Sequence, residues 1–199
     1  MRFFAFFLLL CAGASLAACT PESRRGLPED YRIAPDARFV GVWRGGNEVG
    51  VLQGSEVTAR LTVDPAEPLD LLLAGEENWR STRGIHRRDV KGVVRFYDVA
   101  GRRVVAIRRQ DGTAEEQTWR FAIYRFGGDD SLLLYFMDEP RLRQIIFNGA
   151  LHGKIRGGEP EFPDLLITAE PEKLAALIRS NDPATLFTAR LGPLARQAP

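Results

Sequence analysis

Alternation of apolar and polar side chains is the main pattern of the chain between Phe39 and about Arg156. The segment 57–63 is the clearest example, because its odd positions are apolar and its even positions are polar, as in a strand with one buried face. Turn-forming residues recur at short intervals, at 65–68, 98–101, 111–112 and 127–130. Short strands separated by tight turns are typical of an antiparallel meander. We therefore expect a mainly β domain over residues 37–167, closed into a barrel or strongly curved.

Two hairpins allow the register of neighbouring strands to be predicted. A turn at 98–101 places Val94 opposite Val105, and a tip at Gly128-Asp129 places Ile123 opposite Leu134. Both registers pair apolar with apolar residues, which a wrong register usually does not. The first hairpin then shares an apolar face made of Val94, Phe96, Val105 and Ile107. The second shares a face, expected to point inward, made of Trp119, Phe121, Ile123, Leu134 and Phe136.

The C-terminal part of the chain has helical periodicity. Pro171 suits a first helical position, and Leu174, Leu177 and Ile178 follow at helical spacing. Asp182 can cap a second short helix that carries Leu186 and Phe187. Because the segment 132–137 is apolar on both faces, its outer face needs a cover. We expect residues 168–199 to be a helical segment packed on the β domain, with a frayed tail after Leu194.

The N-terminus has the parts of a secretory signal, namely a basic start at Arg2, a short apolar run and a small-residue exit. The run ends in Leu16-Ala17-Ala18-Cys19, which resembles the lipobox of bacterial lipoproteins. The resemblance implies that residues 1–18 are removed and that Cys19 is acylated, including with palmitate. It also implies that Thr20, where an Asp would retain the protein at the inner membrane, directs the protein to the outer membrane, with its domain in the periplasm or, as the alternative, at the cell surface. Residues 19–36, rich in proline and charge, are expected to be a flexible tether.

Composition excludes several kinds of partner and site. Removal of the signal leaves 26 basic against 26 acidic residues, so no net positive charge favours nucleic acid. Cys11 leaves with the signal and Cys19 is used for lipid, so no thiol remains for a disulfide or a thiolate metal site. The two histidines, His86 and His152, are far apart in sequence, and no serine lies in a nucleophile elbow. We therefore expect no metal, no cofactor and no enzyme activity.

The sequence Gly41-Val42-Trp43 at the start of the meander resembles the calycin superfamily, which includes the lipocalins. The resemblance implies a calycin-like barrel in which Trp43 closes one end and a late basic residue, Arg156 or Lys154, packs over it. It also implies a ligand site for a small apolar molecule such as a fatty acid or lipid, with candidate residues Trp43, Trp119, Phe121 and Phe136. The longer sequence 41–45 also resembles the opening of the nitrobindins, which implies a haem role for His152.

One local excess of positive charge lies at 80–91. Arg83, Arg87 and Arg88 are candidates for contact with an anionic surface such as lipid phosphates. The alternative is a solvated loop in an arginine-rich chain.

Two functions remain open at this stage. Large apolar side chains at the predicted inward positions favour a filled barrel, and hence a structural or interaction protein of the cell envelope. The alternative is a calycin-like binding module for a small apolar ligand. A large apolar cavity beneath Trp43 would favour the binding module, since such sites need roughly 300 Å³ or more, whereas an interior below about 100 Å³ could not take a fatty acid or haem.

Overall fold

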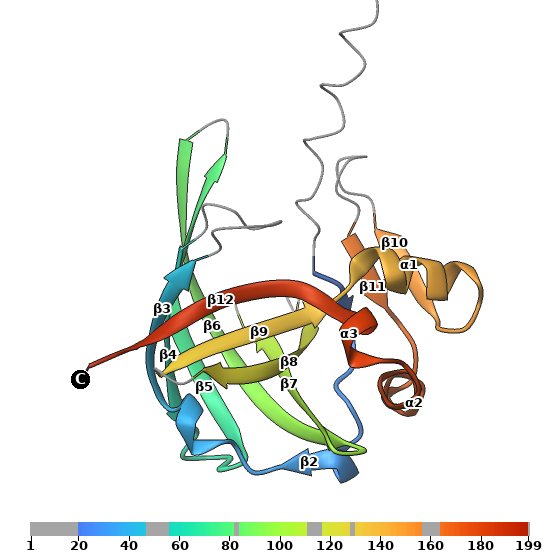
Figure 1. The fold of residues 1–199 in the computed structure, drawn as a ribbon, viewed down its shortest axis with the longest axis horizontal. Coiled ribbons are helices and arrows are strands. Elements are labelled where there is room, and N and C mark those ends of the chain that lie inside the picture. Colours follow the sequence, from blue (N-terminus) through green and yellow to red (C-terminus); the bar gives the residue numbers. More distant parts are fainter. Residues whose placement is uncertain are drawn as a thin grey trace, which may run out of the picture.

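The structure, a computed structural model, describes residues 20–46, 56–81, 84–110, 117–127, 130–156 and 164–198. It is mainly β, with a closed eight-stranded antiparallel barrel and three short helices near the C-terminus, as Figure 1 shows. This is the expected fold class. The barrel strands are β3 (Gly41–Gly46), β4 (Glu56–Val63), β5 (Asp70–Ser81), β6 (Gly84–Val99), β7 (Arg102–Arg109), β8 (Trp119–Gly127), β9 (Ser131–Met137) and β12 (Phe187–Gln197).

The strands β3 to β9 form an up-and-down meander in which each strand pairs with the next along the chain. The ring closes through β12, which pairs with β9 on one side and with β3 on the other. Between β9 and β12 the chain leaves the barrel. That excursion contains α1 (Glu139–Phe147), β10 (Gly153–Arg156), β11 (Asp164–Ile167), α2 (Pro171–Ser180) and α3 (Pro183–Leu186).

Two apolar cores lie on the two sides of the barrel wall. The inner core fills the barrel and includes Trp43, Phe96 and Leu134. The outer core lies between the wall and the helical excursion, where Phe121 packs with residues such as Ile178.

The structure confirms the predicted helix at Pro171. It also confirms the predicted cap, because Asp182 accepts a hydrogen bond from the Ala184 N–H at 2.9 Å. The excursion thus provides the outer cover expected for β9.

Both predicted hairpin registers differ from those in the structure, but only one of the differences exchanges the faces of a strand. In the β6–β7 hairpin Phe96, not Val94, pairs with Val105. That shift of two residues leaves the apolar face unchanged. In the β8–β9 hairpin Tyr135, not Leu134, pairs with Ile123. A shift of one residue exchanges the faces of a strand, so the prediction that Ile123 and Leu134 share a face is wrong.

The predicted tether is also wrong for the part of it that the structure describes. Residues 20–36 carry β1 (Glu22–Ser23), the 3-10 helix η1 (Glu29–Tyr31) and β2 (Arg32–Ile33). They pair with β8 and β11 through β1 and with β6 through β2, and a second 3-10 helix, η2 (Ala37–Phe39), leads into β3. Ser23 and Leu27 are only 1% and 3% exposed. The segment is therefore part of the domain.

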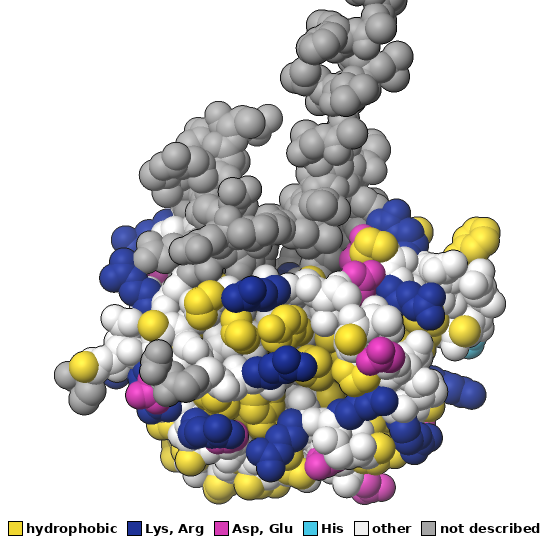
Figure 2. Space-filling view, in the orientation of Figure 1, with side chains coloured by type: hydrophobic (Ala, Val, Ile, Leu, Met, Phe, Trp, Pro, Cys, Tyr) yellow, Lys and Arg dark blue, Asp and Glu magenta, His cyan; other side chains and the backbone are white. Residues whose placement is uncertain are grey.

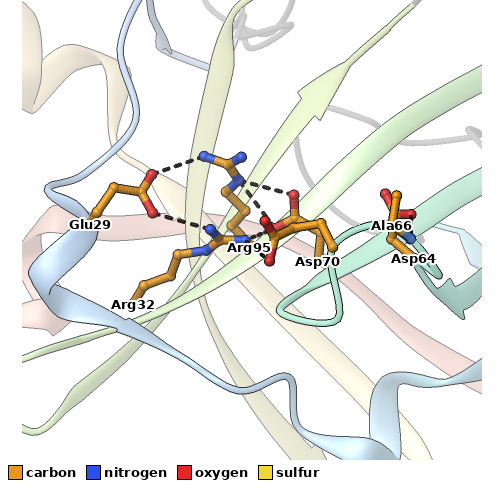
Figure 3. A network of polar contacts seen from close by, with 7 residues as sticks. Glu29, Arg32, Asp64, Ala66, Asp70 and Arg95 are labelled. Carbon is orange, nitrogen blue, oxygen red and sulfur yellow. Dashed lines mark hydrogen bonds and ion pairs between the residues drawn. The ribbon is translucent and has the colours of Figure 1, made fainter.

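Charged side chains that looked solvated in the sequence hold this N-terminal segment on the barrel. Asp70 of β5, 4% exposed, accepts hydrogen bonds from Arg32 of β2 and from the Arg95 Nε of β6, as Figure 3 shows. Glu29 of η1 bonds Arg32 and Arg95, each at 3.1 Å. Buried charges are tolerated because each has an opposite partner.

The C-terminus differs from its prediction as well. Helix α3 ends at Leu186, and the chain from Phe187 to Gln197 is the barrel strand β12. This strand could not be recognised in the sequence, because irregular pairing between Leu191 and Leu194 interrupts its alternation of inward-facing and outward-facing residues. The predicted helical segment with a frayed tail therefore holds for α2 and α3 but fails for the strand that closes the barrel.

Among the described residues, no helix combines the length and the apolar character needed to cross a bilayer.

Candidate functional site: the barrel interior

Aromatic side chains fill one end of the barrel. Phe39, which ends η2, lies with its ring centre 4.9 Å from that of Phe96, 4.8 Å from that of Tyr124 and 5.2 Å from that of Phe126, all edge to face. Asp36 caps η2 by accepting from the Arg38 N–H at 3.1 Å. The side-chain hydrogen bond from Arg38 lowers the pKa of Asp36, and burial raises the pKa of Tyr124. We call this the closed end.

Trp43 lies just inside the closed end and is 1% exposed. Its Nε1–H donates to the Phe39 carbonyl at 2.8 Å, which joins the strand to the 3-10 helix. The Arg196 guanidinium of β12 lies 4.9 Å from the centre of the Trp43 ring. Arg196 also donates to the carbonyls of Val40, at 3.2 Å, and Arg38. The calycin resemblance implied that a basic residue late in the chain packs over Trp43, and in the structure that residue is Arg196.

The expected partners of Trp43 were wrong. Lys154 and Arg156 belong to β10, which pairs only with β11 among the described strands and lies outside the barrel.

The backbone conformation of Gly41 explains why the Gly41-Val42-Trp43 motif begins with a glycine. Its φ of +138° is unfavourable for other residues.

An apolar cavity of about 130 Å³ lies beneath Trp43, inside the barrel. Every described side chain that lines it is apolar. The lining comes from all barrel strands except β8, together with η2, and consists of Phe39, Trp43, Val57, Ala59, Leu61, Leu73, Val94, Val105, Ile107, Leu132, Leu134, Leu191 and Leu194. Small residues such as Ala59 leave space that the larger side chains at the closed end do not occupy. The interior is therefore only partly filled.

A second cavity, of about 120 Å³, continues towards the opposite end of the barrel. It shares Val57, Ala59, Leu73 and Ile107 with the first cavity. We call this end, where β7 ends and β8 begins, the mouth.

The second cavity differs from the first in having charged groups in its lining, namely Glu76, Arg109 and Arg120. Arg120 pairs with Glu22 of β1 at 2.8 Å. The interior of the barrel is thus apolar towards the closed end and carries charged groups at the mouth.

The four predicted ligand residues separate into two pairs. Trp43 lines the apolar cavity and Phe136 lines the cavity at the mouth. Trp119 and Phe121 instead belong to the outer core. The guanidinium carbons of Arg95 and Arg108 lie 5.1 and 4.9 Å from a ring centre of the Trp119 indole. Placing Trp119 and Phe121 in the ligand site was therefore wrong.

The other predicted sites lie outside the barrel interior or outside the described residues. Arg87 is exposed on the β5–β6 hairpin and pairs with Glu76, while Arg83 and the side chain of Arg88 fall outside the described part. Cys19 also falls outside it. His152 is exposed and precedes β10, so the structure does not bring it to the barrel interior.

Sequence reasoning missed the arginines at the mouth and at the closed end. Arg109 follows Ile107 by two residues and Arg120 precedes Ala122 by two, so both continue inward-facing rows. The signal was therefore present as strand parity, but for Arg120 it required the correct inward face of β8. Across the ranges that the structure describes, no three His, Cys, Asp or Glu side chains group in a way that could hold a metal ion.

Comparisons with protein-family models, with curated proteins and with solved structures found no match. The eight-stranded barrel is compatible with a calycin-like barrel.

Proposed function

We propose that the protein is a lipid-anchored envelope protein of the outer membrane whose barrel binds a slim apolar ligand with an acidic end. The role is one of binding, without catalysis, cofactor or nucleic acid. The observation that carries the proposal is the cavity of about 130 Å³ beneath Trp43 with an entirely apolar lining.

The shape of the interior supports a narrow ligand. Pockets for drug-sized molecules have about 300–1,000 Å³, which is more than either cavity in the barrel offers. Haem needs a wide pocket, whereas one acyl chain can extend from the mouth towards Trp43. A single fatty acyl chain is therefore the ligand class that the interior favours.

The charges at the mouth support an acidic end. Arg109 and Arg120 line the outer cavity, and guanidinium groups bind carboxylates and phosphates well. Arg120 also pairs with Glu22 at 2.8 Å. Both arginines are candidates for contact with the acidic end.

A titration with a fluorescent fatty acid and with haemin tests the proposal. We expect saturable micromolar binding of the fatty acid. Ala59→Leu, which extends a side chain into the cavity, should weaken that binding at least about tenfold, since ligand and side chain would need the same space. Thr62→Leu is the matched control, because Thr62 is exposed on the same strand. Equal loss in both variants would contradict a site inside the barrel.

The head group is tested with a pair of ligands. Arg109→Gln should weaken binding of a fatty acid and leave binding of the fatty alcohol of equal length unchanged. An equal effect on both ligands would exclude a charge interaction at the mouth.

A second function is favoured by the modest cavity size and by the aromatic packing at the closed end. A structural or interaction protein would need only the outer surface of a filled barrel. If neither fatty acid nor haemin binds, a pull-down from the outer membrane becomes the next measurement, with Arg87 the first described residue of the basic cluster to mutate.

The anchor is tested separately. Metabolic labelling with palmitate should mark the protein, and Cys19→Ser should abolish the label. Undiminished labelling of Cys19→Ser would contradict lipidation at this residue.

A further inference from the structure

Two large apolar side chains project from the surface between α1 and β10. Phe147, the last residue of α1, is 90% exposed, and Ile155 of β10 is 57% exposed. They line an open groove of about 520 Å³ together with Pro140, Ile146, Gly153 and Leu165. We call this the α1–β10 groove. Figure 2 shows hydrophobic side chains projecting at the corner of the molecule that α1 occupies in Figure 1.

The described chain begins beside this groove. Strand β1 runs parallel to β11, with Glu22 opposite Leu166, and Lys154 of β10 pairs with the same Leu166 from the other side. Neighbouring strands lie about 4.8 Å apart, so β1 and β10 are separated by about 10 Å. Towards Thr20, β1 runs in the direction of the Ile155–Arg156 end of β10. An acyl group on Cys19, three residues before Glu22, would therefore start within about 20 Å of Ile155.

The charges around the groove suit a lipid surface. Arg141 of α1 is exposed, and Lys154 of β10 is exposed on the face of the strand opposite to Ile155. Arg143 lines the groove and pairs with Glu139 one turn away. Basic side chains that flank apolar ones are the arrangement that binds an anionic bilayer, because the apolar groups enter the headgroup region and the cations meet phosphates.

From these relationships we infer that the α1–β10 groove rests on the lipid bilayer, with Phe147 and Ile155 inserted at the headgroup level. The inference rests on the proposed lipid anchor at Cys19, which would hold this corner of the domain at the membrane. The occupant is the bilayer, since the described chain begins at Thr20 on this side of the domain and not at the closed end of the barrel. The domain then has a fixed orientation on the membrane.

Single-cysteine probes in the full-length, lipidated protein test the inference. Phe147→Cys and Ile155→Cys are labelled with an environment-sensitive fluorophore after reconstitution into phosphatidylethanolamine–phosphatidylglycerol vesicles. We expect blue-shifted emission and quenching by spin-labelled lipids at both positions. Ala66→Cys is the matched control, because Ala66 is exposed on the β4–β5 turn at the other end of the barrel, and its probe should stay in water. Phe147→Asp should abolish the quenching at Ile155→Cys.

Each outcome of the experiment decides a separate point. Palmitate labelling with water-like emission at 147 and 155 overturns the inference while the anchor stands. Without palmitate labelling the anchor fails, and the same probes are then read with the unanchored protein and the same vesicles, where absence of quenching also overturns the inference. Probes that are buried in cells but remain in water on vesicles would indicate a protein partner and overturn it as well.

Discussion

Arg196 lies over Trp43 with its guanidinium carbon 4.9 Å from the ring centre, and this contact joins the last barrel strand to the first. Arg196 also donates to the carbonyls of Val40 and Arg38, just before β3. One side chain therefore connects β12, the indole beneath it and the end of η2. Because these groups are far apart in sequence, the contact exists only when the barrel is closed.

Loss of this contact should destabilise the barrel. Arg196→Gln removes the cation above Trp43 and the two hydrogen bonds, and we expect the free energy of unfolding to fall by about 2–3 kcal/mol. Chemical denaturation followed by tryptophan fluorescence measures the change. Arg190→Gln, at an exposed position of the same strand, should change the free energy by less than about 0.5 kcal/mol. Similar losses in both variants would show that the contact with Trp43 has no special role.

The ion pairs of Asp70 should contribute more than those of Glu29, although both carboxylates bind the same arginines. Asp70 has a side chain only 6% exposed, against 63% for Glu29. We expect Asp70→Asn to cost about 2–3 kcal/mol, because it leaves two half-buried guanidiniums short of a charged acceptor. Glu29→Gln should cost less than about 1 kcal/mol, as for an exposed ion pair. Thermal unfolding compares the two, and the reverse order would contradict this account.

Removal of the C-terminal strand should abolish the cooperative fold. A stop codon at Thr188 deletes nearly all of β12 and leaves the edges of β3 and β9 unpaired. Unpaired strand edges favour aggregation. We expect the shortened protein to be insoluble, or to unfold without a cooperative transition in circular dichroism. Deletion of 198–199 alone, beyond the end of β12, is the control and should leave the transition intact.

The stability of the domain should fall at alkaline pH because of Tyr97. Its side chain is fully buried, and burial raises the pKa of its phenol above 10.0. The folded state therefore holds this proton more tightly than the unfolded state, so the contribution is complete below about pH 10 and is lost as the pH rises further. Tyr97→Phe should flatten the alkaline decline measured by denaturant unfolding. Tyr135→Phe, on the barrel wall, is the control for loss of a phenol, and an unchanged decline in Tyr97→Phe would contradict the assignment.

The fold class could be predicted from strand alternation, but the inward face of β8 could not. Leu134 and Phe136 point inward as expected, whereas Trp119 and Phe121 point outward. The reason is that this barrel has an apolar core on each side of its wall. Alternation reveals a buried face only when the other face is polar, and in β8 and β9 both faces are covered.

The candidate site was predicted in part for a related reason. Trp43 could be placed from its glycine-containing motif, because that motif is local in sequence. Its partner Arg196 could not, because β12 follows two helices and has irregular pairing. The ion pairs of Asp70 were equally hidden, since its two arginines lie 38 and 25 residues away.

The position of β1 limits how far the domain could move away from a lipid on Cys19. Only Thr20 and Pro21 separate Cys19 from Glu22, the first residue of β1, and so short a segment spans at most about 10 Å when extended. With a lipid on Cys19, the domain would diffuse laterally along the leaflet and would stay close to the membrane surface. Glu22 pairs with Arg120 at the mouth, so that end of the barrel would stay within the same distance of the acyl chains. A ligand drawn from the membrane could then exchange with the barrel without crossing bulk water, and the exchange rate would depend on lipid packing more than on the ligand concentration in the aqueous phase.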